Sequence, residues 1–312
     1  MDLLSILRTK IASLESGEHT PGLAAVLLHM ETAISHLGRG KDLRDETAFT
    51  DAIYRTNQAF EGSIKEAYRV IAGKDPERTR PFDIEEYLQA NGVLRQRVLA
   101  QFSNYRREWR NPSSHDYKLD FDESEAFLAI VSVAGFACVL LDQIGERLSF
   151  LASKAAADAR GDQLRARLAK TTGQNLAVRL VEILREFSHV LSLGSEGTPL
   201  PITEANLIGA ITGFIASSAP ALETDVEKQM GPTARPDIVV SDGNERVIIE
   251  VKRLGPVSGR ALQVGLTQLD QYLRLSGAAE GILFLVGQGD VQVEEHLLGR
   301  RGRILVIRPE GS

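Results

Sequence analysis

Hydrophobic residues recur at helical spacing from the N-terminus to about residue 195, with little of the two-residue alternation typical of strands. Turn signals such as Thr20-Pro21-Gly22 divide this half into six expected helices, at 2–15, 21–37, 46–73, 84–108, 122–152 and 174–192. Residues 154–170 are rich in Ala, Arg and Lys, which favours an exposed, partly helical connector. The pattern therefore predicts an all-α N-terminal half.

The pattern changes after Leu193. A loop and a short helix at 203–218 precede β-rich segments, which a helical segment at 258–275 interrupts. The strands are expected at 222–229, 236–241, 245–252, 281–286 and 303–308, with Asp242-Gly243-Asn244 as a tight turn between the second and third. We predict two domains: an all-α helical bundle at 1–152 and an α/β domain with a mixed sheet at 196–312, joined by a helical connector at 153–195.

Two carboxylates and a lysine lie at the ends of the second and third predicted strands. Asp237 leads into one strand, and Glu250 and Lys252 end the other. Residues two apart on a strand project from the same face, and the hairpin brings Asp237 alongside them. Because burying unpaired charge is costly, we interpret the cluster as functional. The alternative is a surface ion pair between Glu250 and Lys252 on an edge strand, which is common and nearly neutral in energy.

These residue types suit hydrolysis of a phosphodiester bond. Asp237 and Glu250 offer hard oxygen ligands for Mg²⁺ or Mn²⁺, and the backbone carbonyl of Val251 can complete the metal shell. Lys252 can orient or deprotonate the attacking water and offset the charge that develops on phosphorus. The predicted centre is therefore a catalytic metal site made by four positions of one hairpin.

Over residues 200–308 this arrangement resembles the PD-(D/E)xK restriction-endonuclease-like superfamily. The resemblance rests on Pro236-Asp237, on Glu250-x-Lys252 and on the following helix with Gln268 and Tyr272. It implies a nuclease acting on DNA or RNA. It also implies a catalytic glutamine on that helix and a further acidic residue on the first helix. Gln268 or Gln271 matches the glutamine, and Glu204 best matches the acid, with Glu223 and Glu227 as alternatives.

An arginine and a histidine flank a second turn. Asn111, Pro112 and two serines separate Arg110 from His115, so the two side chains can approach each other across the turn. A histidine can move a proton near neutral pH, and an arginine can stabilise charge on phosphate. Together they can cleave RNA without metal by activating its 2′-hydroxyl. The alternative is a pair that only caps a helix or fills a surface turn.

Arg110, four intervening residues and His115 resemble the R-x4-6-H motif of the HEPN fold, over about residues 20–150. Asn57 and Phe60-Glu61 on an earlier helix are consistent with that bundle. The resemblance implies an RNase whose composite site forms when two copies pair, and hence a homodimer through the helical domain. Many HEPN domains are not catalytic and serve in dimerisation or binding.

Composition and charge limit where such a protein acts. The formal net charge of −6 argues against coating of nucleic acid by the whole surface, so binding must be local. Two arginine-rich runs, at 105–110 and 300–308, lie beside the motifs. The single cysteine, Cys138, leaves no intrachain disulfide, and the apolar run 127–141 is shorter than the ~20 residues of a membrane-spanning helix. We expect a cytoplasmic protein without membrane contact.

Together the motifs predict a metal-dependent nuclease with a HEPN-like domain that dimerises it and adds metal-independent RNA cleavage. Such a pairing of domains resembles antiphage defence proteins, which implies a regulatory or defence-system partner. The alternative function is a noncatalytic scaffold that keeps both folds and binds nucleic acid or a partner protein. An intact set of two acidic residues and a lysine favours the enzyme, because a scaffold has no need of that charge cluster.

Overall fold

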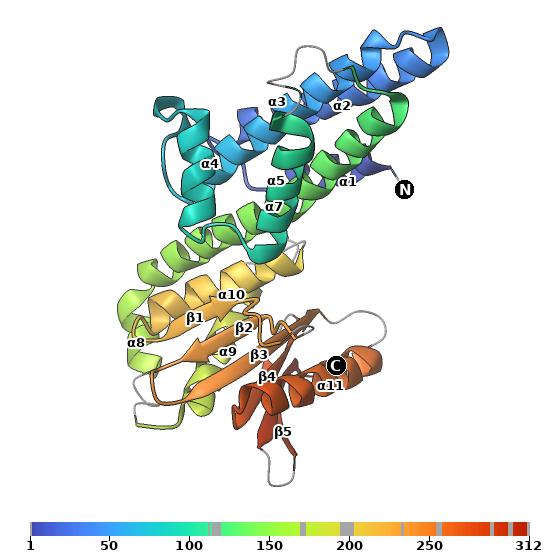
Figure 1. Ribbon diagram of the computed structural model, residues 1–312. Helices are drawn as coiled ribbons and strands as arrows, with labels where there is room; N and C mark the ends of the chain where they lie inside the picture. Colours follow the sequence, from blue (N-terminus) through green and yellow to red (C-terminus); the bar gives the residue numbers. More distant parts are fainter. Residues whose placement is uncertain are drawn as a thin grey trace. The chain divides into compact units, whose positions relative to one another are not determined.

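The chain forms two compact units, Met1–Leu148 and Ser149–Ser312 (Figure 1). The computed structural model describes residues 2–111, 113, 120–168, 173–193, 203–231, 234–253, 258–287, 290–298 and 302–310. Over these residues the first unit is helical, and the second contains a mixed sheet of six strands. The predicted layout of a helical part followed by an α/β part is therefore confirmed.

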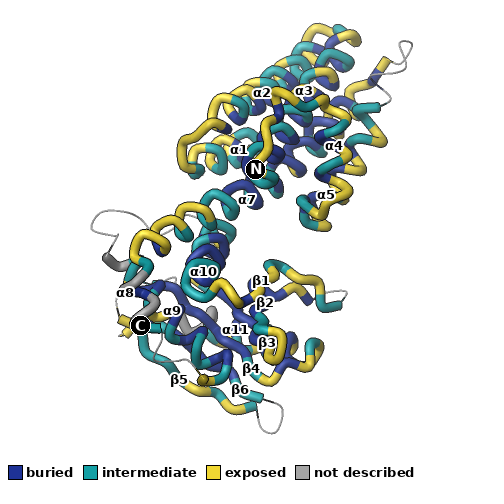
Figure 2. The backbone as a smooth tube through the Cα atoms, turned by 90° about the vertical axis from the view of Figure 1, so that its left-hand side faces the viewer, coloured by how far each residue is buried: buried dark blue, intermediate teal, exposed yellow. Residues whose placement is uncertain are grey.

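The N-terminal unit is a bundle of helices around an aromatic core. Its elements are α1 (Leu3–Ala12), α2 (Thr20–Leu43), α3 (Thr47–Val70), the 3-10 turn η1 (Pro76–Arg78), α4 (Pro81–Ala90), α5 (Gln96–Tyr105), the π-helical turn η2 (Arg106–Arg110) and the first part of α7 (Glu123–Ala159). Phe60 of α3 packs against Phe102, Tyr105 and Phe136, with ring centroids 4.7–5.5 Å apart. In Figure 2 the buried positions lie where the helices of this bundle face one another.

The helix predicted at 84–108 is wrong, because the chain turns between α4 and α5. Asn91 ends α4, and Gly92 has a φ of 62°, a left-handed conformation that glycine adopts without strain. Gln143 of α7 holds the turn: its amide nitrogen donates to the Val93 carbonyl at 2.6 Å, and its oxygen accepts from Arg95 N at 3.3 Å. A partner distant in sequence therefore fixes this break.

The helix predicted at 122–152 extends to Ala159 as α7. By length and composition α7 is able to cross a membrane, but half of its most apolar stretch is buried in the protein. Ala129, Val133, Phe136 and Leu140 belong to the bundle core. This burial is what a core helix of the bundle requires.

The C-terminal unit is built on a sheet with strand order β1-β2-β3-β4-β6-β5. Pairing is antiparallel from β1 to β3 and between β5 and β6, and parallel from β3 through β4 to β6. The strands are β1 (Glu223–Val226), β2 (Ile238–Ser241), β3 (Arg246–Arg253), β4 (Glu280–Val286), β5 (Val291–Leu297) and β6 (Arg303–Pro309). The helices are α8 (Gly161–Leu168), α9 (Leu176–Leu193), α10 (Glu204–Ser218) and α11 (Ser258–Ser276).

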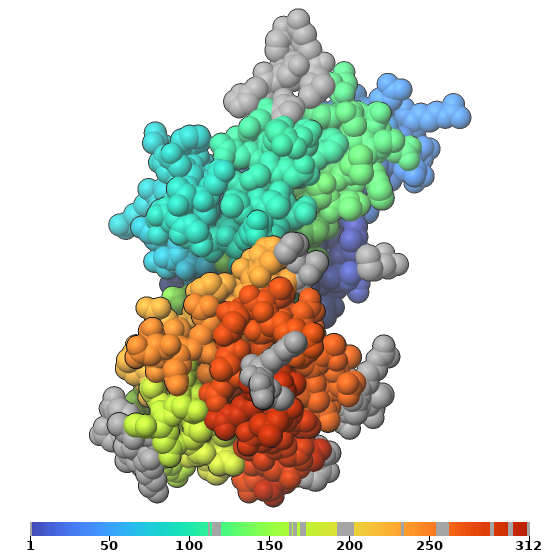
Figure 3. Space-filling view, turned by 60° about the horizontal axis from the view of Figure 1, so that its bottom comes forward, coloured from blue at the N-terminus to red at the C-terminus, as the bar shows by residue number. Residues whose placement is uncertain are grey.

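Helices cover both faces of this sheet, so its central strands are apolar on both sides. Val247, Ile249 and Val251 of β3 face the core formed with α9 and α10, whereas Ile248 faces the core formed with α11. Ala157 and Leu164, from the segment expected as an exposed connector, are buried in the α9 and α10 core. Figure 3 shows the surface of this unit, with α9 in yellow-green beside the C-terminal strands in red.

Strand β5 was not predicted from the sequence. Its residues, Val-Gln-Val-Glu-Glu-His-Leu, are mostly polar and only partly buried, because β5 is the edge strand of the sheet. It pairs with β6 over its full length, from Val291 opposite Pro309 to Leu297 opposite Arg303. Pairing with a neighbour, rather than intrinsic preference, therefore makes this segment a strand.

Helices α7 and α10 approach each other closely at Gly213, so a substitution there tests the packing of the C-terminal unit. A Cβ built at Gly213 of α10 would lie 2.2 Å from the carbonyl oxygen of Phe150 in α7. We expect Gly213→Ala to lower the free energy of unfolding of the C-terminal unit by about 1–3 kcal/mol, because the helices must separate. Urea unfolding followed by circular dichroism measures the change.

The matched control is Gly135→Ala on α7, where an added Cβ meets no atom within 4 Å. There alanine should stabilise the helix by about 0.5–1 kcal/mol, because alanine has the higher helix propensity. Equal responses of the two variants would argue against close packing at Gly213.

Candidate active site

A short hairpin brings the predicted carboxylates together. Asp237 directly precedes β2, and the register pairs Ile238 with Ile249, so Asp237 lies beside Glu250. The turn at the other end of the hairpin is closed by Asp242, whose Oδ1 accepts from Asn244 N at 3.1 Å and Glu245 N at 2.9 Å. Glu250 and Lys252 lie two residues apart on β3, on the face that also carries Ile248 and packs against α11. The structure therefore joins the three residues that the sequence singles out.

The three side chains form a tight buried cluster. Lys252 Nζ donates to Glu250 Oε1 at 2.7 Å and lies 3.9 Å from Asp237 Oδ2. Asp237 Oδ2 also accepts from the backbone N–H of Val251 at 2.8 Å. Glu250 is 2% exposed and Asp237 is 9% exposed. The alternative of a surface ion pair on an edge strand is wrong, because β3 lies inside the sheet and both carboxylates are buried.

Burial makes the charges of this cluster interdependent. Burial first, and then the charge of Glu250, raise the pKa of Asp237 from 3.8 to about 7. Burial also raises the pKa of Glu250, although Lys252 opposes this shift. Burial alone would lower the pKa of Lys252, but Glu250 and Asp237 raise it overall. In the part of the chain that the structure describes, two buried carboxylates thus face the one ammonium group of Lys252.

The donor set fits a hard divalent cation. Glu250 Oε2 is buried and has no hydrogen-bond partner among the described residues, although a buried carboxylate oxygen normally has one. Within the described ranges no three His, Cys, Asp or Glu side chains group together, so a metal would be held by two carboxylates. That set suits Mg²⁺, which commonly takes one or two carboxylates and completes its shell with water and substrate phosphate. The Val251 carbonyl remains a predicted further ligand.

Two further predicted residues lie within electrostatic range of the cluster. Glu204 is the first residue of α10, and its charge raises the pKa of both Asp237 and Glu250. The Tyr272 hydroxyl donates to the Arg235 carbonyl at 3.3 Å. Burial, followed by the charges of Glu250 and Asp237, raises the pKa of Tyr272. The site therefore draws on α10 and α11 as well as on the hairpin.

Of the two candidate glutamines on α11, Gln268 is the better placed. It lies one helical turn before Tyr272, on the same side of the helix, and is half-buried with no partner for Oε1 among the described residues. Gln271 is exposed. Of the two alternative acids, Glu223 is exposed on the edge strand β1, whereas the backbone N–H of Glu227 donates to the Asp237 carbonyl at 3.1 Å.

In the helical unit, Arg110 ends the π-helical turn η2, and His115 lies outside the described residues. Ser113, which lies between them in the sequence, is described. Its hydroxyl donates to the Arg110 carbonyl at 3.1 Å and accepts from the Asn57 amide at 2.7 Å. Tyr105 in turn donates to Asn57 Oδ1 at 2.8 Å. A buried polar network thus fixes the backbone at Arg110.

In the described parts of the two arginine-rich runs, most arginines pair with glutamates. Arg303 pairs with Glu280 and Glu295, and Arg308 pairs with Glu294. In the other run, Arg106 and Arg110 face the buried Glu85 of α4. The position of Glu85 beside these arginines could not be predicted, because a continuous helix at 84–108 would place it far from both. The Asn91-Gly92 pair was the available signal for the break.

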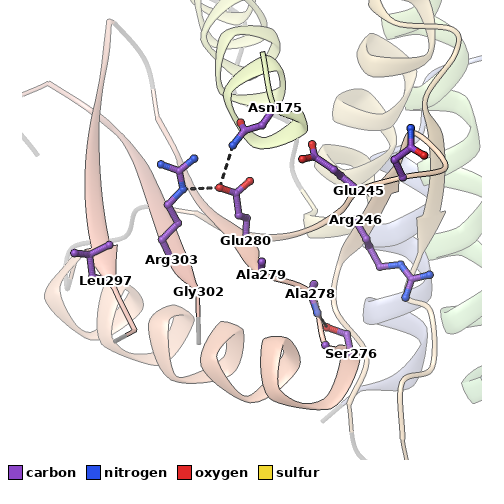
Figure 4. A pocket seen from close by; sticks show the side chains of 12 residues that line it. Asn175, Glu245, Arg246, Ser276, Ala278, Ala279, Glu280, Leu297, Gly302 and Arg303 are labelled. Atoms are coloured by element: carbon purple, nitrogen blue, oxygen red, sulfur yellow. Dashed lines mark hydrogen bonds and ion pairs between the residues drawn. The ribbon is translucent and has the colours of Figure 1, made fainter. Parts of the chain in front are cut away.

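A concavity of about 690 Å³ lies away from the carboxylate cluster (Figure 4). It is lined by the first residues of β3, β4 and β6, including Arg246, Glu280 and Arg303, whereas Glu250 and Lys252 lie toward the other end of β3. Figure 4 shows Asn175 and Arg303 both bonded to Glu280. The carboxylate cluster is the stronger candidate site, because Glu280 in the concavity already pairs with Arg303 and Asn175.

No family model, curated protein or solved structure matches this chain.

Proposed function

We propose that the C-terminal unit is a metal-dependent nuclease that hydrolyses phosphodiester bonds, with Asp237, Glu250 and Lys252 as its centre. The buried carboxylate pair carries this proposal: among the described residues Glu250 Oε2 has no partner, and one ammonium group faces two carboxylates. Such an arrangement is unfavourable without a cation and suited to one.

Each residue has a role in this chemistry. Asp237 and Glu250 would hold the metal, with the Val251 carbonyl as a further oxygen donor, and Glu204 would add to the negative charge around it. When bound, Mg²⁺ or Mn²⁺ lowers the pKa of a water ligand and offsets charge on the phosphate. The Lys252 ammonium, held by Glu250 at 2.7 Å, orients the attacking water and balances charge as the phosphorus becomes pentacoordinate. Gln268, beside Tyr272 on α11, positions the water or the substrate.

A cleavage assay tests this function. Purified protein is incubated with labelled single-stranded DNA, double-stranded DNA and RNA, each with Mg²⁺, Mn²⁺ or EDTA. Cleavage that requires the metal supports the proposal and shows whether DNA or RNA is preferred. Absence of cleavage on every substrate favours the noncatalytic scaffold.

We further propose that the helical unit is a HEPN-like RNase and dimerisation domain, so that the protein is a homodimer acting in the cytoplasm, in antiphage defence. The observation that favours this second function is the buried network of Asn57, Tyr105 and Ser113, which holds the backbone at Arg110. A turn that only capped a helix would not need a buried asparagine and tyrosine to anchor it.

Arg110→Ala and His115→Ala should each lower RNA cleavage in EDTA by at least roughly tenfold, because the arginine stabilises phosphate charge and the histidine moves the proton. Single-stranded RNA with one 2′-deoxynucleotide at the scissile position is the substrate control, since it lacks the internal nucleophile. Metal-dependent cleavage should remain unchanged in both variants. RNA cleavage in EDTA that persists in both variants would assign the motif a structural role.

A further inference from the structure

A buried carboxylate in the helical unit has no part in the chemistry proposed above. Glu85 of α4 is 2% exposed, and neither of its oxygens has an aligned hydrogen bond to a described residue. Two guanidinium groups face it instead. Arg106 Nε lies 3.1 Å from Oε2, and Arg110 Nη2 lies 3.5 Å from Oε1. One carboxylate is therefore shared by two arginines of the turn η2.

The break between α4 and α5 creates this arrangement. In one continuous helix, residues 85 and 106 would lie roughly 31 Å apart, at ~1.5 Å per residue. The turn held by Gln143 redirects the chain between α4 and α5, so that Arg106, which follows α5, lies beside Glu85. The π-helical turn η2 then places Arg106 and Arg110 toward the same carboxylate. Such turns occur often at functional sites.

Burial and the neighbouring arginines act in opposite directions on the charge of Glu85. Burial raises the pKa of Glu85, whereas Arg110 and Arg106 favour its ionised form. Arg110 is held mainly from its buried side: its side chain is 20% exposed, and its Nε is buried without a partner among the described residues. Nη2 also lies 3.7 Å from Glu61, which is 39% exposed, and Nη1 donates to Asn111 Oδ1 at 3.2 Å. A fixed guanidinium with part of its edge accessible is suited to a phosphate.

We propose that Glu85 is a positioning residue for Arg110, which holds the guanidinium in place for a phosphate group of RNA. Arg106 balances the rest of the buried carboxylate charge. The inference rests on the RNA-cleaving function proposed for the helical unit. If the role of Glu85 were only structural, the ion pairs would do no more than fasten α4 to η2.

A double-mutant cycle on the full chain separates these roles. Glu85→Gln should lower the rate of RNA cleavage in EDTA by about 10- to 100-fold, because a misplaced group loses most of its effect. The variant combining Glu85→Gln with Arg110→Ala should be no slower than Arg110→Ala alone, because Glu85 acts through Arg110. Losses that multiply in the double variant would overturn the proposal.

The matched control is Glu86→Gln, the exposed neighbour of Glu85 on the same helix. It should leave cleavage and thermal stability unchanged. If Glu85→Gln does not fold, Glu85→Asp serves in its place. It keeps the charge and shortens the side chain by one methylene, and the same criteria apply to it.

A second measurement reads the position of Arg110 without RNA. In ¹⁵N-labelled protein, the Nε–Hε signal of Arg110 is identified by its loss in Arg110→Ala. Glu85→Gln should shift or broaden this signal, and Glu86→Gln should not. A signal unchanged in Glu85→Gln would overturn the positioning role. If the signal responds but the wild-type protein does not cleave RNA in EDTA, the RNase function fails and the positioning role stands.

Discussion

Replacing Glu250 by glutamine should lower metal-dependent cleavage by at least about 100-fold and leave the protein folded. Glutamine keeps the shape of the side chain and removes the charge that binds the metal. Glu250 is 2% exposed and its ionised form is disfavoured by burial, so its neutral replacement should not lower the melting temperature in EDTA. Cleavage rates at saturating Mg²⁺, together with thermal unfolding in EDTA, measure the two effects.

The control is Glu295→Gln, on the edge strand β5 of the same sheet. Its side chain is 47% exposed and pairs only weakly with Arg303, at 3.4 Å. This variant should cleave at the wild-type rate. Lys252→Ala should resemble Glu250→Gln in activity, and its control is Lys154→Ala on α7, an exposed lysine. Cleavage by Glu250→Gln at the wild-type rate would contradict the assignment of Glu250 as a catalytic metal ligand.

Replacing Asp237 by asparagine should stabilise the metal-free protein at pH 8, by up to about 4 kcal/mol. The pKa of Asp237 is raised from 3.8 to about 7, mainly by burial. A carboxyl with a raised pKa binds a proton in the folded state that the unfolded chain has already lost. The wild-type protein should therefore be most stable below about pH 4 as far as this group is concerned, and lose that stability as the pH rises toward 7.

Denaturant unfolding in EDTA at pH 5, 6, 7 and 8 measures this effect. The wild-type free energy of unfolding should fall across the series relative to that of Asp237→Asn, and the gain in the variant should be largest at pH 8. Asp225→Asn, an exposed residue on β1, is the control and should show no pH-dependent gain. Addition of Mg²⁺ at pH 8 should stabilise the wild-type protein but not Asp237→Asn. A variant less stable than wild type at pH 8 would contradict the assigned sign.

The hairpin of the candidate site could be predicted because its information is local. Asp242-Gly243 specifies the turn, and the apolar runs on either side fix the strands, so the pairing of Asp237 with Glu250 follows from counting residues. The tightness of the cluster could not be predicted. It depends on α11 and α10, which bring Tyr272 and Glu204 near from outside the hairpin.

The helix break after α4, the contacts of Glu85 and strand β5 could not be predicted, because each depends on residues distant in the chain. Gln143 holds the turn at Val93, and nothing near Val93 indicates that partner. The meeting of Glu85 with Arg106 and Arg110 follows from that turn and was missed with it. Strand β5 is polar and becomes a strand only beside β6. Local sequence patterns therefore predict most of the helices and strands. Contacts between residues far apart in the chain decide where a helix breaks and which segment pairs as a strand.

The hydrogen bond from Val251 N to Asp237 Oδ2 ties one candidate metal ligand to the strand that carries the other. A slip of one residue between β2 and β3 would turn Glu250 and Lys252 toward the opposite face of the sheet, where α9 and α10 pack. Because the turn at 242–245 sets this register, an insertion there that shifted the pairing by one residue would have the same effect. The number of residues between the two candidate ligands is thus constrained over evolutionary time as strongly as the ligands themselves.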